Sequence, residues 1–208
     1  RMARTPELPD SLPLAEPPEM PASASSKVII DLEDVHANYG DKRVLESVTW
    51  RMTGSHHTLI EGPNGCGKST LLSLICGENH MAYGQKVRLF GKQRGSGETV
   101  WEIKSRFGLV SNELHNKYVK GWKALDVVVS GLYDSVGLYD DSVASDRAVA
   151  KAWLSCLGLA DSAACYYHEL SFGQQRLVLL ARAMVKSPAV LILDEPCVGL
   201  DDSHRQLI

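Results

Sequence analysis

The sequence predicts an α/β fold with a parallel sheet, preceded by an antiparallel β portion and carrying an inserted helical region. Three observations predict this class. A glycine-rich loop at 62–70 lies between a short apolar stretch and a helical pattern. An unbroken apolar run at 189–193, typical of a buried parallel strand, ends in two carboxylates. Strand-like patterns gather before the loop, whereas helical patterns dominate the stretch from about 113 to 184.

The composition is that of a soluble globular protein. The chain has 208 residues, of which 44% are hydrophobic and 23% charged, and its formal net charge is -3. This charge argues against nonspecific binding of nucleic acid. No apolar run is long enough to cross a bilayer, so we expect any membrane association to come through a partner. Five cysteines without paired spacing favour a reducing, cytosolic compartment.

The composition of the first 26 residues predicts an extended linker. They contain six prolines followed by Ala22-Ser23-Ala24-Ser25-Ser26, without apolar periodicity. The chain also opens on Arg1 rather than on methionine. We therefore expect a piece of a longer protein, with a folded domain over 27–208.

Two strands are predicted next. The stretches 28–32 and 35–39 lead to a turn at Gly40-Asp41, and 44–50 is the expected hairpin partner. Tyr39, at the end of the first strand, could stack on an adenine ring, because an aromatic face tolerates any base. The residues alone favour an ordinary tyrosine at a strand end.

The glycine loop predicts a phosphate site. Thr58-Leu59-Ile60 reads as a strand, and Leu71, Leu72, Leu74 and Ile75 begin a helix. Backbone N–H groups of such a loop converge on a phosphate, and the helix N-terminus adds positive potential. Lys68 would neutralise the β- and γ-phosphates, while the Ser69 hydroxyl would bind magnesium. The alternative is a chance match in a glycine-rich turn.

Two short strands are predicted after the loop helix, at 87–91 and 107–112. Between them 94–97 reads as a surface turn rather than a second phosphate nest. The small polar end of the second strand, including Asn112, suits either a sensor of a γ-phosphate or metal, or a simple capped strand end.

Two longer helices follow. Ser145-Asp146 is expected to cap a helix that stops at Gly158. Its Trp153 is expected to pack in the core or between domains rather than to bind a ligand. A second helix follows Ser171 and ends before Ser187-Pro188.

The apolar run 189–193 predicts a strand buried on both faces, with Asp194 and Glu195 at its carboxyl end. Carboxylates at this position suit metal chemistry, with Asp194 binding magnesium and Glu195 polarising the attacking water. The alternative is a solvated charged pair at a strand end.

Together these motifs resemble the ATP-binding cassette (ABC) ATPases from about 28 to 208. Gly62 to Thr70 resembles the Walker A loop, Leu191 to Glu195 resembles Walker B, and Leu170 to Gln174 resembles the signature motif. Val198-Gly199-Leu200-Asp201 resembles the D-loop, and Tyr39 takes the place of the adenine-stacking aromatic. The resemblance implies a P-loop NTPase core that binds ATP and Mg²⁺.

The residues that the resemblance assigns fall into five groups. The nucleotide-binding residues are Tyr39, Gly62, Pro63, Asn64, Gly65, Cys66, Gly67, Lys68, Ser69 and Thr70. The signature residues are Ser171, Phe172, Gly173 and Gln174, and the D-loop residue is Asp201. Glu195 is the catalytic base, and the metal ligands are Ser69, Asn112 and Asp194.

A narrower resemblance is to the second cassette of ModF-type proteins, tandem ATP-binding proteins associated by name with molybdenum transport. It rests on the stretches 101–104, 130–137, 170–177 and 199–208. In that arrangement 1–26 joins a first cassette to this one.

Three departures limit this resemblance. Phe172 replaces a signature glycine and is expected to bring a bulky ring near the nucleotide interface. Asn112 stands in place of the longer Q-loop glutamine. The sequence also ends before the expected switch histidine, so we expect weak ATPase activity from this chain alone.

The resemblance implies closure against a second cassette, in the same chain or in a homodimer, with Ser171 of one cassette facing the γ-phosphate bound by the other. Two function classes remain open: the motor of a membrane importer, plausibly for molybdate and with a membrane subunit, and a soluble ATP-driven switch acting on a macromolecule. Either class places the chain in the cytoplasm, the first at the cytoplasmic face of the inner membrane.

Overall fold

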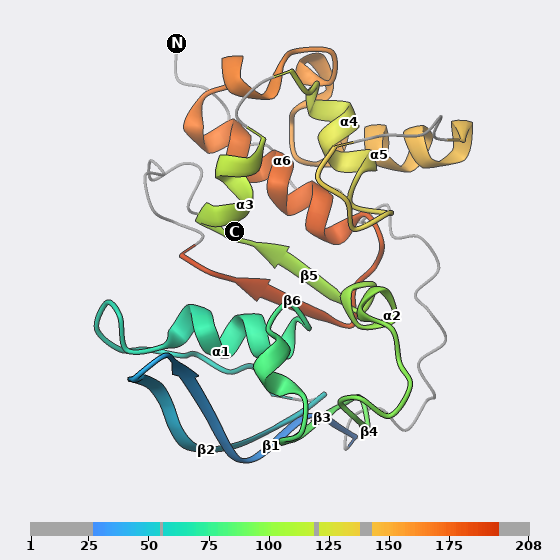
Figure 1. Ribbon diagram of the computed structural model, residues 1–208. Helices are drawn as coiled ribbons and strands as arrows, with labels where there is room; N and C mark the ends of the chain where they lie inside the picture. Colours follow the sequence, from blue (N-terminus) through green and yellow to red (C-terminus); the bar gives the residue numbers. More distant parts are fainter. Residues whose placement is uncertain (1–26, 55, 119–120, 138–142, 196–208) are drawn as a thin grey trace. The chain divides into compact units, whose positions relative to one another are not determined.

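The computed structural model describes residues 27–54, 56–118, 121–137 and 143–195. Within these residues the chain forms two compact units, the first ending at Lys104 and the second beginning at Ser105 (Figure 1). The predicted linker 1–26 and the D-loop residue Asp201 lie outside the described residues.

The first unit is built on an antiparallel sheet. Its strands are β1 (Val28–Tyr39), β2 (Lys42–Thr53), β3 (Lys86–Leu89) and β4 (Lys92–Gln93), in the order β2-β1-β3-β4. The helices are α1 (Lys68–Ile75), a 3-10 helix at His80–Ala82 and α2 (Val100–Lys104). The sheet confirms the predicted hairpin, because β1 pairs with β2 and turns back at Gly40.

One face of this sheet carries the core of the unit. In β1, the side chains of Ile30, Leu32, Val35 and Ala37 are buried. Buried residues of β3 and α1 complete the apolar layer. Burial alternates only in part, because Ile29 is buried as well and the register shifts between Leu32 and Val35.

The stretch Thr58-Leu59-Ile60 does not form the predicted strand. Leu59 is 81% exposed, and none of the described strands pairs with these three residues. A strand needs a neighbour for its N–H and C=O groups, and three residues provide little apolar surface to recruit one. The residues that lead into the phosphate loop therefore lie outside the described strands.

The second unit contains a parallel strand pair. β5 (Phe107–Val110) and β6 (Val190–Leu193) pair in parallel, with Phe107 opposite Val190. The helices are α3 (Asn112–Lys117), α4 (Ala124–Val129), α5 (Ala144–Cys156) and α6 (Phe172–Met184), with 3-10 helices at Ala160–Ser162 and Tyr167–Glu169. Figure 1 shows α6 running beside the two strands. The α/β class with its parallel pair and helical region is confirmed.

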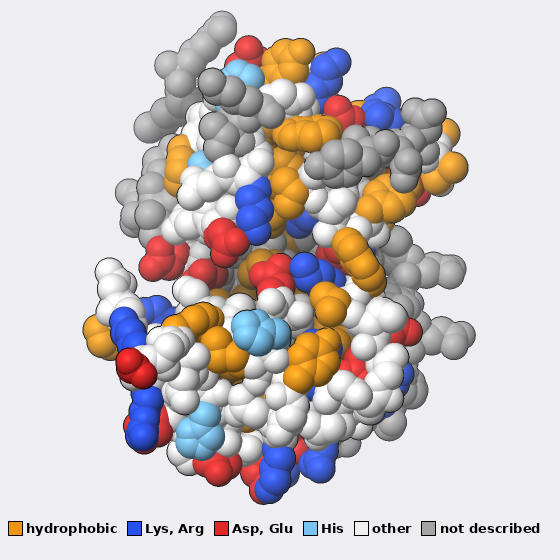
Figure 2. All heavy atoms as spheres, in the orientation of Figure 1, with side chains coloured by type: hydrophobic (Ala, Val, Ile, Leu, Met, Phe, Trp, Pro, Cys, Tyr) orange, Lys and Arg blue, Asp and Glu red, His pale blue; other side chains and the backbone are white. Residues whose placement is uncertain are grey.

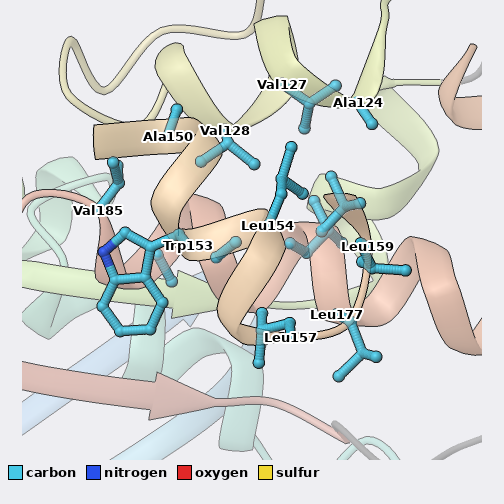
Figure 3. Close-up of a cluster of buried hydrophobic side chains, with 14 of the residues drawn as sticks. Ala124, Val127, Val128, Ala150, Trp153, Leu154, Leu157, Leu159, Leu177 and Val185 are labelled. Carbon is cyan, nitrogen blue, oxygen red and sulfur yellow. The ribbon is translucent and has the colours of Figure 1, made fainter. Parts of the chain in front are cut away.

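A large apolar cluster joins the helices of this unit. Figure 3 shows Trp153 and Leu154 of α5 pointing toward side chains of α4 and α6. Trp153 is only 2% exposed within this cluster, so of the two roles predicted for it the structure shows core packing. The cluster also includes residues of α6 from Leu177 onward, and Leu170, which precedes the signature serine, packs against it.

Two boundaries differ from those predicted, and a third agrees. β5 ends at Val110, and Ser111 caps α3, so Asn112 opens a helix instead of closing a strand. The N-cap of α5 is Val143, which leaves Ser145 and Asp146 in the first turn, where an acidic side chain favours the helix dipole. Gly158 ends that helix with a φ of +71°, as its freedom at positive φ allows.

The prediction that the last strand is buried on both faces is wrong for this unit. Val190 and Ile192 are buried, whereas Leu191 and Leu193 are each 37% exposed. Residues alternate across a strand, and the burial of β6 alternates in the same way, while α6 packs against β5.

None of the described helices has both the length and the apolar character needed to span a membrane. On the face seen in Figure 2, acidic and basic side chains are interspersed.

Candidate nucleotide-binding site

The glycine loop has a backbone that only small residues permit. Gly65 and Gly67 have φ values of +79° and +104°. A Cβ added at Gly67 would come within 2.8 Å of the Val44 carbonyl oxygen and of the Leu45 side chain, both on β2. A Cβ at Gly62 would lie 2.7 Å from the sulfur of Cys66. The loop is therefore folded tightly on itself and against β2.

Lys68 places its charge over this loop. Its Nζ donates to the carbonyl oxygens of Gly62 and Pro63, at 2.7 and 3.1 Å. The ammonium group thus lies at the loop, as the predicted contact with the β- and γ-phosphates requires.

The N-terminus of α1 is suited to an anion. Gly67 is its N-cap and has no side chain to accept from the first N–H groups, and the first turn contains no acidic residue. Helix N-termini of this kind bind phosphate through N–H groups and the helix dipole. Ser69 is exposed in this turn, where its hydroxyl can reach a ligand.

Tyr39 is linked to α1 by Asn79. The buried Asn79 donates from Nδ2 to the Tyr39 hydroxyl at 3.0 Å and to Oγ of Ser73 at 3.3 Å. The Tyr39 side chain keeps half of its surface exposed. An anchored hydroxyl and an exposed ring fit the predicted stacking role.

The second unit brings together two predicted residues that lie far apart in the sequence. Asn112 of α3 donates from Nδ2 to Oε2 of Glu195 at 3.0 Å. Glu195 follows β6 with an unusual φ of +51°. Asp194 continues the parallel ladder, since its N–H donates to the carbonyl oxygen of Val110 at 2.9 Å. The carboxylates and Asn112 therefore gather at the carboxyl ends of β5 and β6.

A buried arginine contacts this group. Nη2 of Arg176 donates to Oδ1 of Asn112, and its guanidinium lies 5.0 Å from the centre of the Phe172 ring. Burial lowers the pKa of Arg176, opposed by Tyr167, Glu195 and Asp194.

His115 of α3 contacts Tyr167 and Phe172 beside this group. Its Nδ1 shares a 2.9 Å hydrogen bond with the hydroxyl of Tyr167, and its ring lies 5.3 Å from that of Phe172. Burial and then the charge of Arg176 lower the pKa of His115. Burial raises the pKa of Tyr167, so its hydroxyl stays protonated. Phe172 thus packs on residues of its own unit, although it remains 37% exposed.

The signature residues form the start of α6. Ser171 is the N-cap, and its Oγ accepts from the N–H of Gln174 at 3.3 Å while its own N–H donates to Oε1 of Gln174 at 3.0 Å. This capping box fixes the first turn, with Gly173 buried behind it.

Each unit carries oxygen donors of the kind that magnesium takes together with a nucleotide. Within the described ranges no group of three or more His, Cys, Asp or Glu side chains forms a metal cage. Mg²⁺ commonly takes one or two protein oxygens together with substrate phosphates, and the predicted ligands Ser69 and Asp194 are of that kind. Oδ1 of Asn112, the third predicted ligand, is already engaged by Arg176.

Sequence reasoning missed Arg176, His115 and Asn79. Arg176 follows Phe172 by four residues on a helix, a spacing that puts both on one face, and this was the one available signal. Nothing local to His115 or Asn79 indicates their partners, which come from other elements.

Comparison with known proteins assigns the family. The model of the ABC transporter family matches residues 45–198. The ABC transporter ATP-binding protein ModF of Escherichia coli is 42% identical over 93% of this chain, and the zinc uptake system ATP-binding protein ZurA of Listeria monocytogenes is 34% identical over 84%. The structure of cbiO1 from Clostridium perfringens, part of the ABC transporter complex cbiONQ, is 26% identical with a TM-score of 0.70, covering 87% of this chain and 71% of that one.

The chain spans 40% of the length of ModF and 66% of that of ZurA. The family match, by contrast, covers most of the chain, including the phosphate loop, the signature residues and the carboxylates after β6. The chain therefore belongs to the ABC transporter family, as an ATP-binding cassette.

Proposed function

We propose that this chain is the Mg²⁺-dependent ATP-hydrolysing cassette of a tandem ABC protein that energises molybdate import. The observation that carries ATP binding is the loop of 62–70, where Lys68 lies over tightly folded glycines at an open helix N-terminus. The 42% identity to ModF, of which the chain spans less than half, supports the tandem arrangement.

Each residue has a defined part in this proposal. Lys68 and the loop N–H groups hold the phosphates, Tyr39 stacks on the base, and Ser69 and Asp194 bind magnesium. Bound magnesium would neutralise charge on the phosphates. Glu195 takes the proton of the attacking water.

Closure requires a second cassette, whose signature serine faces the γ-phosphate. Ser171 and the N-terminus of α6 would serve the partner's nucleotide in the same way. We place the pair in the cytoplasm, bound peripherally to a membrane subunit. The chain alone would hydrolyse ATP slowly.

Nucleotide binding is tested with Lys68→Ala. Titration of the full chain with a fluorescent ATP analogue should give a dissociation constant at least about tenfold higher for the variant. Lys92→Ala, an exposed lysine on β4 of the same unit, is the matched control. Equal affinities of the Lys68 variant and the unmodified chain would contradict the proposed phosphate contact.

The cargo is tested in cells that express the chain. Elemental analysis should show a loss of cellular molybdenum on gene deletion, restored by the unmodified gene and not by one encoding Lys68→Ala. A loss of zinc or manganese instead would assign a different cargo.

The second candidate is a soluble ATP-driven switch. The observation that favours it concerns Asn112, which takes the place of the Q-loop glutamine. Its side chain is hydrogen-bonded within its own unit, to Arg176 and to Glu195. Unchanged metal contents, together with a protein that carries no membrane subunit through purification, would favour this function.

A further inference from the structure

Arg176 is a buried cation for which no motif accounts. Its side chain lies on α6 with 0% of the residue exposed. Nη2 donates to Asn112, but Nε and Nη1 have no hydrogen-bond partner among the residues that the structure describes. Burying a cation and leaving donors unsatisfied both cost free energy. An apolar residue would serve the core of α6 better, so this charge points to a role other than stability.

The hydrogen bonds of Asn112 indicate the role of the positive charge on Arg176. A side-chain amide has one end that accepts and one that donates. Because Oδ1 of Asn112 faces the guanidinium of Arg176, Nδ2 faces Oε2 of Glu195 at 3.0 Å. The reversed amide would place N–H groups against the guanidinium and the oxygen against a carboxylate. Arg176 therefore sets the orientation of the amide electrostatically.

Glu195 needs such a restraint. It is an exposed residue at the end of β6, with a φ of +51° that non-glycine residues rarely adopt. An exposed glutamate has several rotamers of similar energy, and a general base acts only from a defined position. The hydrogen bond from Asn112 is the restraint that the structure provides.

We propose that Arg176 is a positioning residue for the base Glu195, acting through Asn112, and that Asn112 is a relay in this chain rather than a metal ligand. The inference rests on the proposed ATPase function. A divalent cation bound to Oδ1 of Asn112 would share that oxygen with a buried guanidinium, and the two positive charges would repel each other.

The ring of Phe172 shields the Arg176–Asn112 hydrogen bond from water. This ring covers the guanidinium of Arg176 from the preceding turn of α6, and His115 packs against the same ring. Excluding water lowers the local dielectric and strengthens the Arg176–Asn112 hydrogen bond. The bulky residue that replaces a signature glycine thus has a function within its own unit.

The first test needs neither nucleotide nor metal. In the full chain, the side-chain NH₂ signals of Asn112, identified by their loss in Asn112→Asp, should lie outside the range of exposed asparagines. Arg176→Met should move them toward that range, and Glu195→Gln should shift them. Arg182→Met is the matched control, because Arg182 is also a buried arginine of α6 but donates to Tyr118 and Ser135. Unmoved signals in Arg176→Met would overturn the relay.

The second test uses steady-state ATPase kinetics. Arg176→Met should lower kcat by about tenfold or more, as for a misplaced general base, with the KM for ATP changed less than about twofold. Arg176→Lys should recover part of kcat, since an ammonium group can donate to Oδ1 of Asn112. Equal losses of kcat in Arg176→Met and Arg182→Met would show a structural effect and overturn the proposal.

The Mg²⁺ dependence of turnover distinguishes a relay role of Asn112 from that of a metal ligand. Asn112→Ala should lower kcat and leave the Mg²⁺ concentration for half-maximal turnover unchanged. A clear rise in that concentration would make Asn112 a metal ligand and overturn the relay.

Should Arg176→Met fail to fold, Arg176→Lys and Asn112→Ala carry the same tests. An unmodified chain without ATPase activity would contradict the proposed function, while the NMR test would still decide whether Arg176 orients Asn112.

Discussion

Gly67 combines two constraints that a side chain would violate. Its φ is +104°, and an added Cβ would contact the Val44 carbonyl oxygen at 2.8 Å. We expect Gly67→Ala to lower the free energy of unfolding by about 1–3 kcal/mol, through backbone strain and overpacking. Gly65→Ala is the control, because Gly65 also has positive φ but meets nothing within 4 Å. Chemical denaturation should therefore show the smaller loss, about 1 kcal/mol, for Gly65→Ala; equal losses would mean that the contact with β2 is unimportant.

Glu195 offers a test of the chemical step. In Glu195→Gln the side-chain oxygen can still accept from Asn112, but the group can no longer take a proton. We expect turnover to fall by about 10²–10⁴-fold with ATP affinity nearly unchanged. Glu113→Gln on α3, an exposed carboxylate that pairs with Lys117 at 2.8 Å, is the control. Equal phosphate release by the unmodified chain and Glu195→Gln would remove Glu195 from the role of base.

At the scale of residues, the sequence predicted the site residues that are adjacent in the chain. The loop of 62–70 could be found because its residues and their chemistry are adjacent in the chain. Arg176 and Asn79 could not, since the hydrogen bonds that define them join residues of different elements. Asn112 was found by position, but its proposed role as a metal ligand did not anticipate the guanidinium at its oxygen.

At the scale of elements, α3 makes stability depend on pH. Burial and Arg176 lower the pKa of His115, so the folded chain holds this imidazole neutral where the unfolded chain, with a pKa of about 6.5, binds a proton. The unfolded state therefore binds more protons between the two pKa values, and stability falls as the pH decreases through this window.

His115→Gln should weaken this dependence. The glutamine side chain can still hydrogen-bond to Tyr167 but does not titrate. Denaturation midpoints measured from about pH 7.5 to about pH 5 should change less for the variant than for the unmodified chain. His168→Gln, at an exposed histidine, serves as the control. An unchanged pH profile in His115→Gln would show that another group dominates.

Periodicity predicted most elements because burial follows it. The hairpin β1–β2, the helices α5 and α6 and the parallel strand β6 all come from apolar spacing or apolar runs. The failures lie where tertiary pairing decides the outcome. Residues 58–60 pair with none of the described strands, and Leu191 and Leu193 are more exposed than Val190 and Ile192 of the same strand. Neither property is contained in the local sequence.

At the scale of the whole molecule, the proposed function requires association. Glu195→Gln should retain ATP and so accumulate the closed pair of cassettes. We expect the mass from sedimentation velocity to double when Mg²⁺ and ATP are added to this variant. The double variant Lys68→Ala/Glu195→Gln should stay at its original mass, since it lacks the lysine that holds the phosphates. A doubling in both variants would show association that is independent of nucleotide.

The link from Tyr39 through Asn79 to α1 bears on which nucleobases the chain accepts. The tyrosine hydroxyl accepts a hydrogen bond from Nδ2 of Asn79, which anchors it, and half of the side chain stays exposed, so in the proposed stacking role it offers its π-face to a base. Stacking on such a face distinguishes bases poorly. On the proposal that Tyr39 stacks on the base, the triphosphate rather than the base selects the nucleotide, and GTP should compete with ATP on nearly equal terms.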